Sequence, residues 1–132
     1  MLNTINPRAF CEIIYCGYTR WNAFTLDEPS GRIEFDAVVT DRGGEKTYKV
    51  AFDGVRLLPD DSLHLREAQG PDDRLELSVI EIEREAAGWR LWFNPWYLHE
   101  IQFHCDRVHL DGVEVVGGGR WLQDDLPSRT AG

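Results

Sequence analysis

The amino-acid sequence predicts a mainly β domain, an antiparallel sandwich or barrel of about 8–10 short strands with one short N-terminal helix. Apolar and polar residues alternate with a period of two along most of the chain, which is typical of half-buried strands. All six prolines lie between the apolar segments, where their missing N–H groups disturb a sheet least. The 132 residues suit one domain, so we expect residues 1–126 to form it and residues 127–132 to be a loose polar tail.

One segment, NPRAFCEIIYCG, favours a helix. Asn6 is a good N-cap, and Pro7 suits the first helical position, where no N–H donor is needed. Gly17 can end the helix. The i, i+3, i+4 spacing of one buried face is seen at Phe10, Ile13 and Ile14. A strand is the competing interpretation, because Ile, Tyr and Cys also favour sheets.

Residues 32–55 predict a long hairpin. The sequence DRGGEK separates its two strands, and Gly43 and Gly44 can adopt the positive φ that a tight turn requires. In the first strand the apolar face is Ile33, Phe35, Ala37 and Val39. In the second strand it is Tyr48, Val50 and Phe52.

The second half of the chain also alternates. SLHLRE predicts a short strand, and YTRWNAFTL, LHEIQFHC and RVHLDGVEVV add further β structure. In DRLELSVIEIERE the apolar parity changes between Val79 and Ile80, which indicates a bulge or a strand that changes the face it buries. The AAG at residues 86–88 then joins this segment to WRLWFN in a second hairpin.

Three segments, IEFDAVV, VAFDGVR and IQFHCDRV, each place a Phe before a polar position, and we expect an inward ring followed by a kinked strand.

Composition limits the classes of partner. The formal net charge is −9, and residues 45–88 carry 11 acidic and 6 basic side chains. This balance opposes nucleic-acid binding, which depends on cationic neutralisation of phosphate, and it would suit a basic protein partner. No apolar run approaches the roughly 20 residues of a membrane span. The three cysteines form no CxxC motif, so we expect reduced thiols, a cytoplasmic protein and no cofactor.

The segment WRLWFNPWYLHEIQFHC is rich in metal-binding residue types. The candidate ligands are His99, His104, Cys105 and His109, to which a distant strand could add His64. In an extended strand His104 and His109 would lie roughly 16 Å apart, and neighbouring residues would face opposite sides of the sheet. We therefore expect separate side chains here rather than a metal site.

Other chemical motifs are absent or incomplete. No GxSxG elbow is present, and Cys11, Cys16 and Cys105 have the character of buried apolar residues. The carboxylate pairs, such as Asp60-Asp61, lie beside prolines, and turn formation and solubility explain them. The glycine run VVGGGRW is followed by no long helix, so it predicts a hinge or bulge rather than a phosphate site.

Two tryptophans do not fit a single apolar core. Trp89, Leu91 and Phe93 share one parity, which leaves Trp92 on the opposite face beside Arg90. After the Asn94-Pro95 turn, Trp96 falls on the same side as Glu100. Either a sandwich buries both faces of these strands, or Trp92, Trp96, Arg90 and Glu100 form an interface.

The sequence therefore favours a non-catalytic protein-binding module, of the size and charge of a small immunity or inhibitor protein that neutralises a basic partner. One alternative is a β-barrel carrier of a small apolar ligand, lined by Phe35, Phe52, Phe103 and Trp89. A second alternative is a metal- or thiol-dependent enzyme whose residues converge from distant strands.

Overall fold

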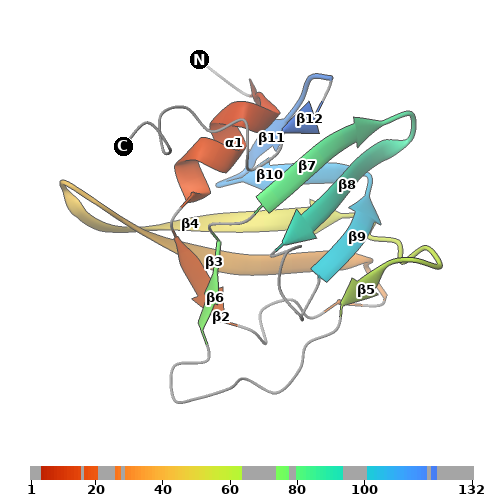
Figure 1. Cartoon of the computed structure of the whole chain (residues 1–132), viewed down its shortest axis with the longest axis horizontal. Coiled ribbons are helices and arrows are strands. Elements are labelled where there is room, and N and C mark those ends of the chain that lie inside the picture. Colours follow the sequence, from red (N-terminus) through yellow and green to blue (C-terminus); the bar gives the residue numbers. More distant parts are fainter. Residues whose placement is uncertain are drawn as a thin grey trace.

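The fold is a two-layer β structure with one short helix (Figure 1). The computed structural model describes residues 4–15, 17–20, 26–27, 29–63, 74–77, 80–93, 101–118 and 120–121. These residues form a seven-stranded sheet of order β1-β11-β10-β4-β3-β2-β6 and a five-stranded sheet of order β12-β7-β8-β9-β5. The two sheets have separate edge strands, so the predicted sandwich is confirmed and the barrel alternative is not adopted.

The strands are short except for one hairpin. In the seven-stranded sheet they are β1 (Thr4–Ile5), β2 (Tyr18–Arg20), β3 (Arg32–Asp41), β4 (Gly44–Asp53), β6 (Arg74–Glu76), β10 (Arg107–Leu110) and β11 (Val113–Val115). In the five-stranded sheet they are β5 (Ser62–Leu63), β7 (Ile80–Glu85), β8 (Gly88–Phe93), β9 (Ile101–Cys105) and β12 (Arg120–Trp121).

The predicted helix is confirmed as α1 (Pro7–Ile14). Asn6 caps it, because its side chain accepts a hydrogen bond from Ala9 N at 2.7 Å. Phe10, Cys11 and Ile14 are buried in the core, which is the face that the apolar spacing predicts. The helix therefore closes one end of the sandwich rather than adding a strand.

The predicted long hairpin is also confirmed. β3 and β4 pair from Arg32–Asp53 to Asp41–Gly44, and Gly44 has a φ of 104°. Ile33, Phe35 and Ala37 are buried as the alternation requires. The closed end of the hairpin extends beyond the other strands at the left of Figure 1.

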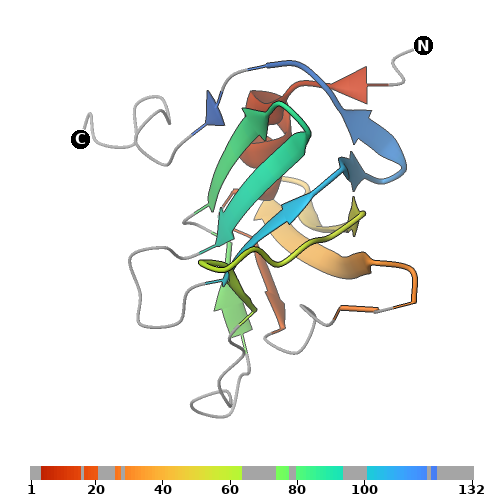
Figure 2. The same ribbon diagram turned by 90° about the vertical axis from the view of Figure 1, so that its right-hand side faces the viewer.

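The parity change near residue 80 marks a change of sheet. β6 pairs with β2 in the seven-stranded sheet, whereas β7 pairs with β8 in the five-stranded sheet. The sequence predicts one long strand here, and the structure divides it in two. Figure 2 shows β7, β8 and β9 side by side in their layer.

Two strands turn from one layer to the other. β9 continues into β10 through a bend at Asp106, whose N–H donates to Asp53 O at 2.8 Å. β4 ends at Gly54, with a φ of 67°, before the chain joins the five-stranded sheet. The kinks expected after Phe52 and Phe103 are thus present, but β3 pairs regularly past Phe35, so the kink predicted there is wrong.

A cluster of aromatic rings fills the space between the layers. Phe35 and Phe52 of the seven-stranded sheet contact Phe93 and Phe103 of the five-stranded sheet, with ring centroids 5.1–6.3 Å apart. Trp89 is also buried. The four residues that would line a carrier barrel are core residues, and three of them, Phe35, Phe52 and Phe103, belong to this ring cluster.

Two further details differ from the sequence expectation. The segment RVHLDGVEVV is a tight hairpin of β10 and β11, since Asp111 and Gly112 adopt positive φ at the turn. β1 pairs with β11 in parallel, which makes the seven-stranded sheet mixed rather than purely antiparallel. Within the described residues, the helical structure has neither the length nor the apolar character needed to cross a membrane.

Candidate functional site

The candidate site lies on the side of the five-stranded sheet that faces away from the core. Its side chains alternate with buried apolar residues along β7, β8 and β9, so the period of two places them on one surface. We call this surface the polar face and define it by Glu81, Glu83, Glu85, Arg90, Trp92, Gln102 and His104. Glu81, Gln102 and His104 are each only 8% exposed, which is unusual for polar residues on an outer surface.

A buried carboxylate joins the loop before β5 to this face. The side chain of Asp61 is 1% exposed and accepts hydrogen bonds from His104 Nδ1 at 2.6 Å and Gln102 Nε2 at 2.8 Å. It also accepts from Leu58 N at 2.9 Å, within a turn that Pro59 favours. A buried carboxylate requires such partners, because desolvation without hydrogen bonds would cost several kcal/mol.

His104 is held between two carboxylates. Its Nδ1 faces Asp61, and its Nε2 lies 3.2 Å from Glu85 Oε1. Its backbone pairs with Arg56 through hydrogen bonds of 2.7 and 3.0 Å. An imidazole oriented by a carboxylate is one half of a catalytic arrangement, but among the described residues neither ring nitrogen has a hydroxyl or thiol partner.

Arg90 and Trp92 form the other part of the polar face. The guanidinium carbon of Arg90 lies 4.0 Å from the centre of the Trp92 ring, and the same guanidinium is paired with Glu83. Arg90 Nε and Trp92 Nε1 are both buried, and neither has a hydrogen-bond acceptor in the described part of the chain. Buried donors without acceptors are rare in native proteins, so this pair is unusual among the described residues.

Two exposed leucines border the polar face. Leu57 and Leu58 are 48% and 46% exposed and precede the turn that Asp61 holds against β9. Arg56, just before them, is paired with Asp106 and donates to Ala87 O at 3.3 Å. The turn thus presents apolar side chains on a backbone that several hydrogen bonds hold in place.

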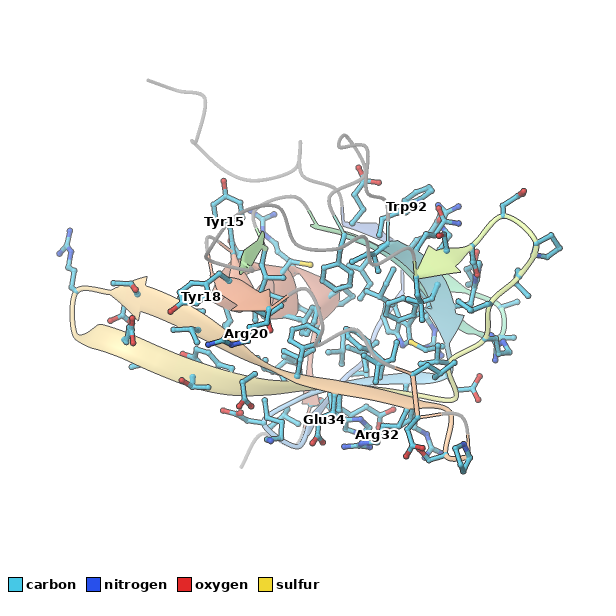
Figure 3. All side chains as sticks on the ribbon, turned by 90° about the horizontal axis from the view of Figure 1, so that it is seen from below. Tyr15, Tyr18, Arg20, Arg32, Glu34 and Trp92 are labelled. Atoms are coloured by element: carbon cyan, nitrogen blue, oxygen red, sulfur yellow. The ribbon has the colours of Figure 1, made fainter. Side chains whose placement is uncertain are left out.

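The structure describes two of the four residues of the predicted interface, Arg90 and Trp92. Trp92 and Arg90 lie on the polar face, opposite the core residues of β8, as the alternation predicts. Figure 3 shows Trp92 on the opposite side of the molecule from Arg32 and Glu34. Trp96, Glu100 and His99 belong to residues 94–100, and His64 to residues 64–70, which lie outside the described residues.

The candidate metal ligands that the structure describes are not brought together. His104 lies on the polar face, Cys105 points into the core, and His109 lies on the seven-stranded sheet, 3.4 Å from Asp53. Within the described ranges, no group of three or more His, Cys, Asp or Glu residues has a metal-binding arrangement. The separation follows from alternation on β9 and from the bend that carries β10 into the other sheet.

The two described cysteines are protonated thiols at neutral pH. Burial, and after it the charge of the neighbouring Asp106, raise the pKa of Cys105 to about 12. Burial also raises the pKa of Cys11 well above its ordinary value. Both side chains therefore act as core residues, and Cys16 lies outside the described residues.

Sequence reasoning missed the four acidic residues of the site, Asp61, Glu81, Glu83 and Glu85. Asp61 does form the predicted turn, but the explanation by solubility is wrong, because its carboxylate is buried. Its partner His104 lies 43 residues further along the chain. Glu83 and Glu85 could have been found, because the alternation of IEIERE places both on the side of the strand opposite Ile82. The contact between Glu85 and His104 crosses from one strand to another and has no signal in the sequence.

The outer side of the seven-stranded sheet is also charged, but its charges are paired. Arg32 contacts Glu34 at 2.7 Å and Asp53 at 2.5 Å, and Lys49 lies 3.6 Å from Glu34. These groups surround a hollow of about 250 Å³ above Ala51. Such a network is explained by cross-strand ion pairing, and we do not assign it a ligand.

Comparisons of the chain with protein-family models, with curated proteins and with solved structures gave no match.

Proposed function

We propose that the protein is a non-catalytic binding module for a basic protein, which docks on the polar face and the adjoining Leu57–Leu58 turn. The observation that carries the proposal is the Arg90–Trp92 pair, whose two buried donors have no acceptor among the described residues. Each unpaired buried donor costs about 1–3 kcal/mol, and a partner that displaced the groups covering these donors and supplied acceptors would remove this cost. Trp and Arg are also the residue types that contribute most to binding energy at protein interfaces.

The charge of the chain supports a basic partner. Glu83 and Glu85 have side chains that are 32% and 37% exposed on the polar face, and the net charge is −9. A surface of this sign attracts cationic proteins and accelerates their association. An inhibitor or immunity protein for a cationic target is one form that such a module takes.

The Leu57–Leu58 turn supports a protein rather than a small ligand. Its exposed leucines add an apolar contact beside the charged one, and the hydrogen bonds of Asp61 and Arg56 hold the turn in place. A contact surface that is ordered before binding loses less conformational entropy when the complex forms.

The test compares Trp92→Ala and Arg90→Ala with Lys46→Ala, a control whose side chain is 60% exposed in the β3–β4 hairpin. Partners are cross-linked in cells of the source organism and identified with wild-type protein, and the purified partner is then titrated against each variant. We expect the two polar-face variants to bind at least about 30-fold more weakly and the control to bind like wild type. Wild-type affinity in all three variants would show that the polar face is not the binding surface.

A further inference from the structure

His104 lies between two carboxylates on the polar face. Both ring nitrogens face carboxylate oxygens, Nδ1 at 2.6 Å from Asp61 and Nε2 at 3.2 Å from Glu85. Ionised carboxylates only accept hydrogen bonds, so a ring nitrogen is attracted to its carboxylate only when it carries a proton. The neutral ring has one N–H donor and the imidazolium has two. Only the protonated ring can therefore pair with both carboxylates at once.

The two carboxylates would respond differently if His104 lost a proton. Asp61 is 1% exposed and accepts two further hydrogen bonds. Its buried negative charge needs the His104 Nδ1–H as a donor, so the neutral ring keeps its one proton on Nδ1. Glu85 is 37% exposed and has no other hydrogen bond or ion pair among the described residues. Without a proton on Nε2, nothing holds Glu85, and its carboxylate can turn into solvent at little cost.

The other charged groups around His104 are already paired. Arg90 lies directly opposite it on β8 and is bound to Glu83, and Arg56 pairs with the backbone of His104 while its guanidinium binds Asp106. Within the described part of the chain, these cations leave the charges of Asp61 and Glu85 to be balanced by His104. Loss of its proton therefore adds one negative charge to the polar face.

We propose that His104 is a proton-controlled clamp on Glu85, which makes the polar face more acidic, and its hold on a basic partner stronger, as the pH rises. The effect on binding rests on the proposed function, whereas the clamp itself is a property of the isolated protein.

The first experiment follows the ring nitrogens of His104 and the carboxyl carbon of Glu85 by NMR between about pH 5.5 and about pH 8 in the full-length protein. We expect two protonated nitrogens at low pH, only Nδ1 protonated at high pH, and a shift of the Glu85 carbon that follows the ring. His109→Gln is the matched control and should leave these changes intact, because His109 lies on the other sheet. A ring that keeps its proton on Nε2, or a Glu85 signal that does not follow it, would overturn the clamp.

The second experiment titrates a lysine decapeptide into the protein at both pH values and follows the indole N–H of Trp92. We expect about two- to fivefold tighter binding at the higher pH, the usual effect of one exposed charge, in wild type and His109→Gln. Glu85→Gln removes the carboxylate that the clamp releases and should reduce this difference, and its exposed position makes it a safer variant than His104→Gln, which removes the partner of the buried Asp61. Peptide binding on the polar face without a pH difference would refute the clamp, while the NMR changes without peptide binding would count against the proposed function.

Discussion

Gly54 and Gly88 lie at turns where the structure requires glycine for different reasons. Both have positive φ, 67° and 136° respectively. A Cβ on Gly54 would meet the Asp106 carboxylate, the end of a side chain that can move. A Cβ on Gly88 would lie 2.2 Å from the backbone oxygen of Cys105, which β9 holds in place. The second position is therefore the stricter one.

Gly88→Ala should destabilise the protein by about 3 kcal/mol, because backbone strain and a contact with backbone act together. The matched control is Gly118→Ala, at an exposed glycine with open space around its Cβ position, and it should change stability by less than about 1 kcal/mol. Denaturant unfolding followed by circular dichroism measures both values. Equal stability of the two variants would contradict the strain at Gly88.

Asp61 illustrates how far residue-level prediction reaches. Its place in a turn after Pro59 could be predicted from the local sequence, because turn formation depends on neighbouring residues. Its burial could not, since the three donors that satisfy it include side chains from β9. The same holds for Glu85, which becomes part of the site only when β7 and β9 lie in one sheet.

Strand β8 separates the core from the polar face. Trp89 is 1% exposed in the core, where Arg84 stacks on its ring at 4.8 Å. Trp92, three residues later, faces the other way and stacks with Arg90. Two identical side chains on one strand thus have different roles, which follow from their parity.

Replacing each tryptophan by alanine should reveal this difference. Trp89→Ala leaves a large cavity in the core and should lower the free energy of unfolding by about 3–5 kcal/mol. Trp92→Ala removes a stacked and half-buried ring and should cost about 1 kcal/mol. Urea unfolding followed by far-UV circular dichroism compares them, and a larger loss for Trp92→Ala would place that residue in the core.

The two sheets of the molecule share one core. β9 runs into β10 across the bend at Asp106, and the segment from β6 to β7 also passes from one sheet to the other. Phe52 contacts Phe35 within its own sheet and Phe93 and Phe103 in the opposite one. Neither sheet can lose its strands without exposing the apolar face of the other, so we expect cooperative unfolding.

Phe52→Ala should lower the stability of both layers together, by about 3–5 kcal/mol. Far-UV circular dichroism reports on all strands, and the exchange of backbone amides in β3 and β8 reports on each sheet separately. These probes should give one transition in wild type and in the variant. Loss of protection in one sheet before the other would show that the layers unfold independently.

The sequence by itself determined the local features of this protein: the helix after Asn6, the hairpins at residues 32–53 and 80–93, and the inward face of each. These depend on periodicity, capping and turn chemistry, which act over a few residues. It also placed Arg90 and Trp92 opposite the core. The parity change near residue 80 indicated where the strand is interrupted, but not that the chain passes there from one sheet to the other.

Only the tertiary structure decided that the fold is a sandwich, that β1 pairs in parallel with β11, and that His104 lies between Asp61 and Glu85. These features depend on which strands become neighbours. Strand pairing brings together residues distant in the chain, and alternation specifies the face of a side chain but not its neighbours across the sheet. A buried charge is stable only where such neighbours provide hydrogen bonds, so the polar face of this protein exists only in the folded chain.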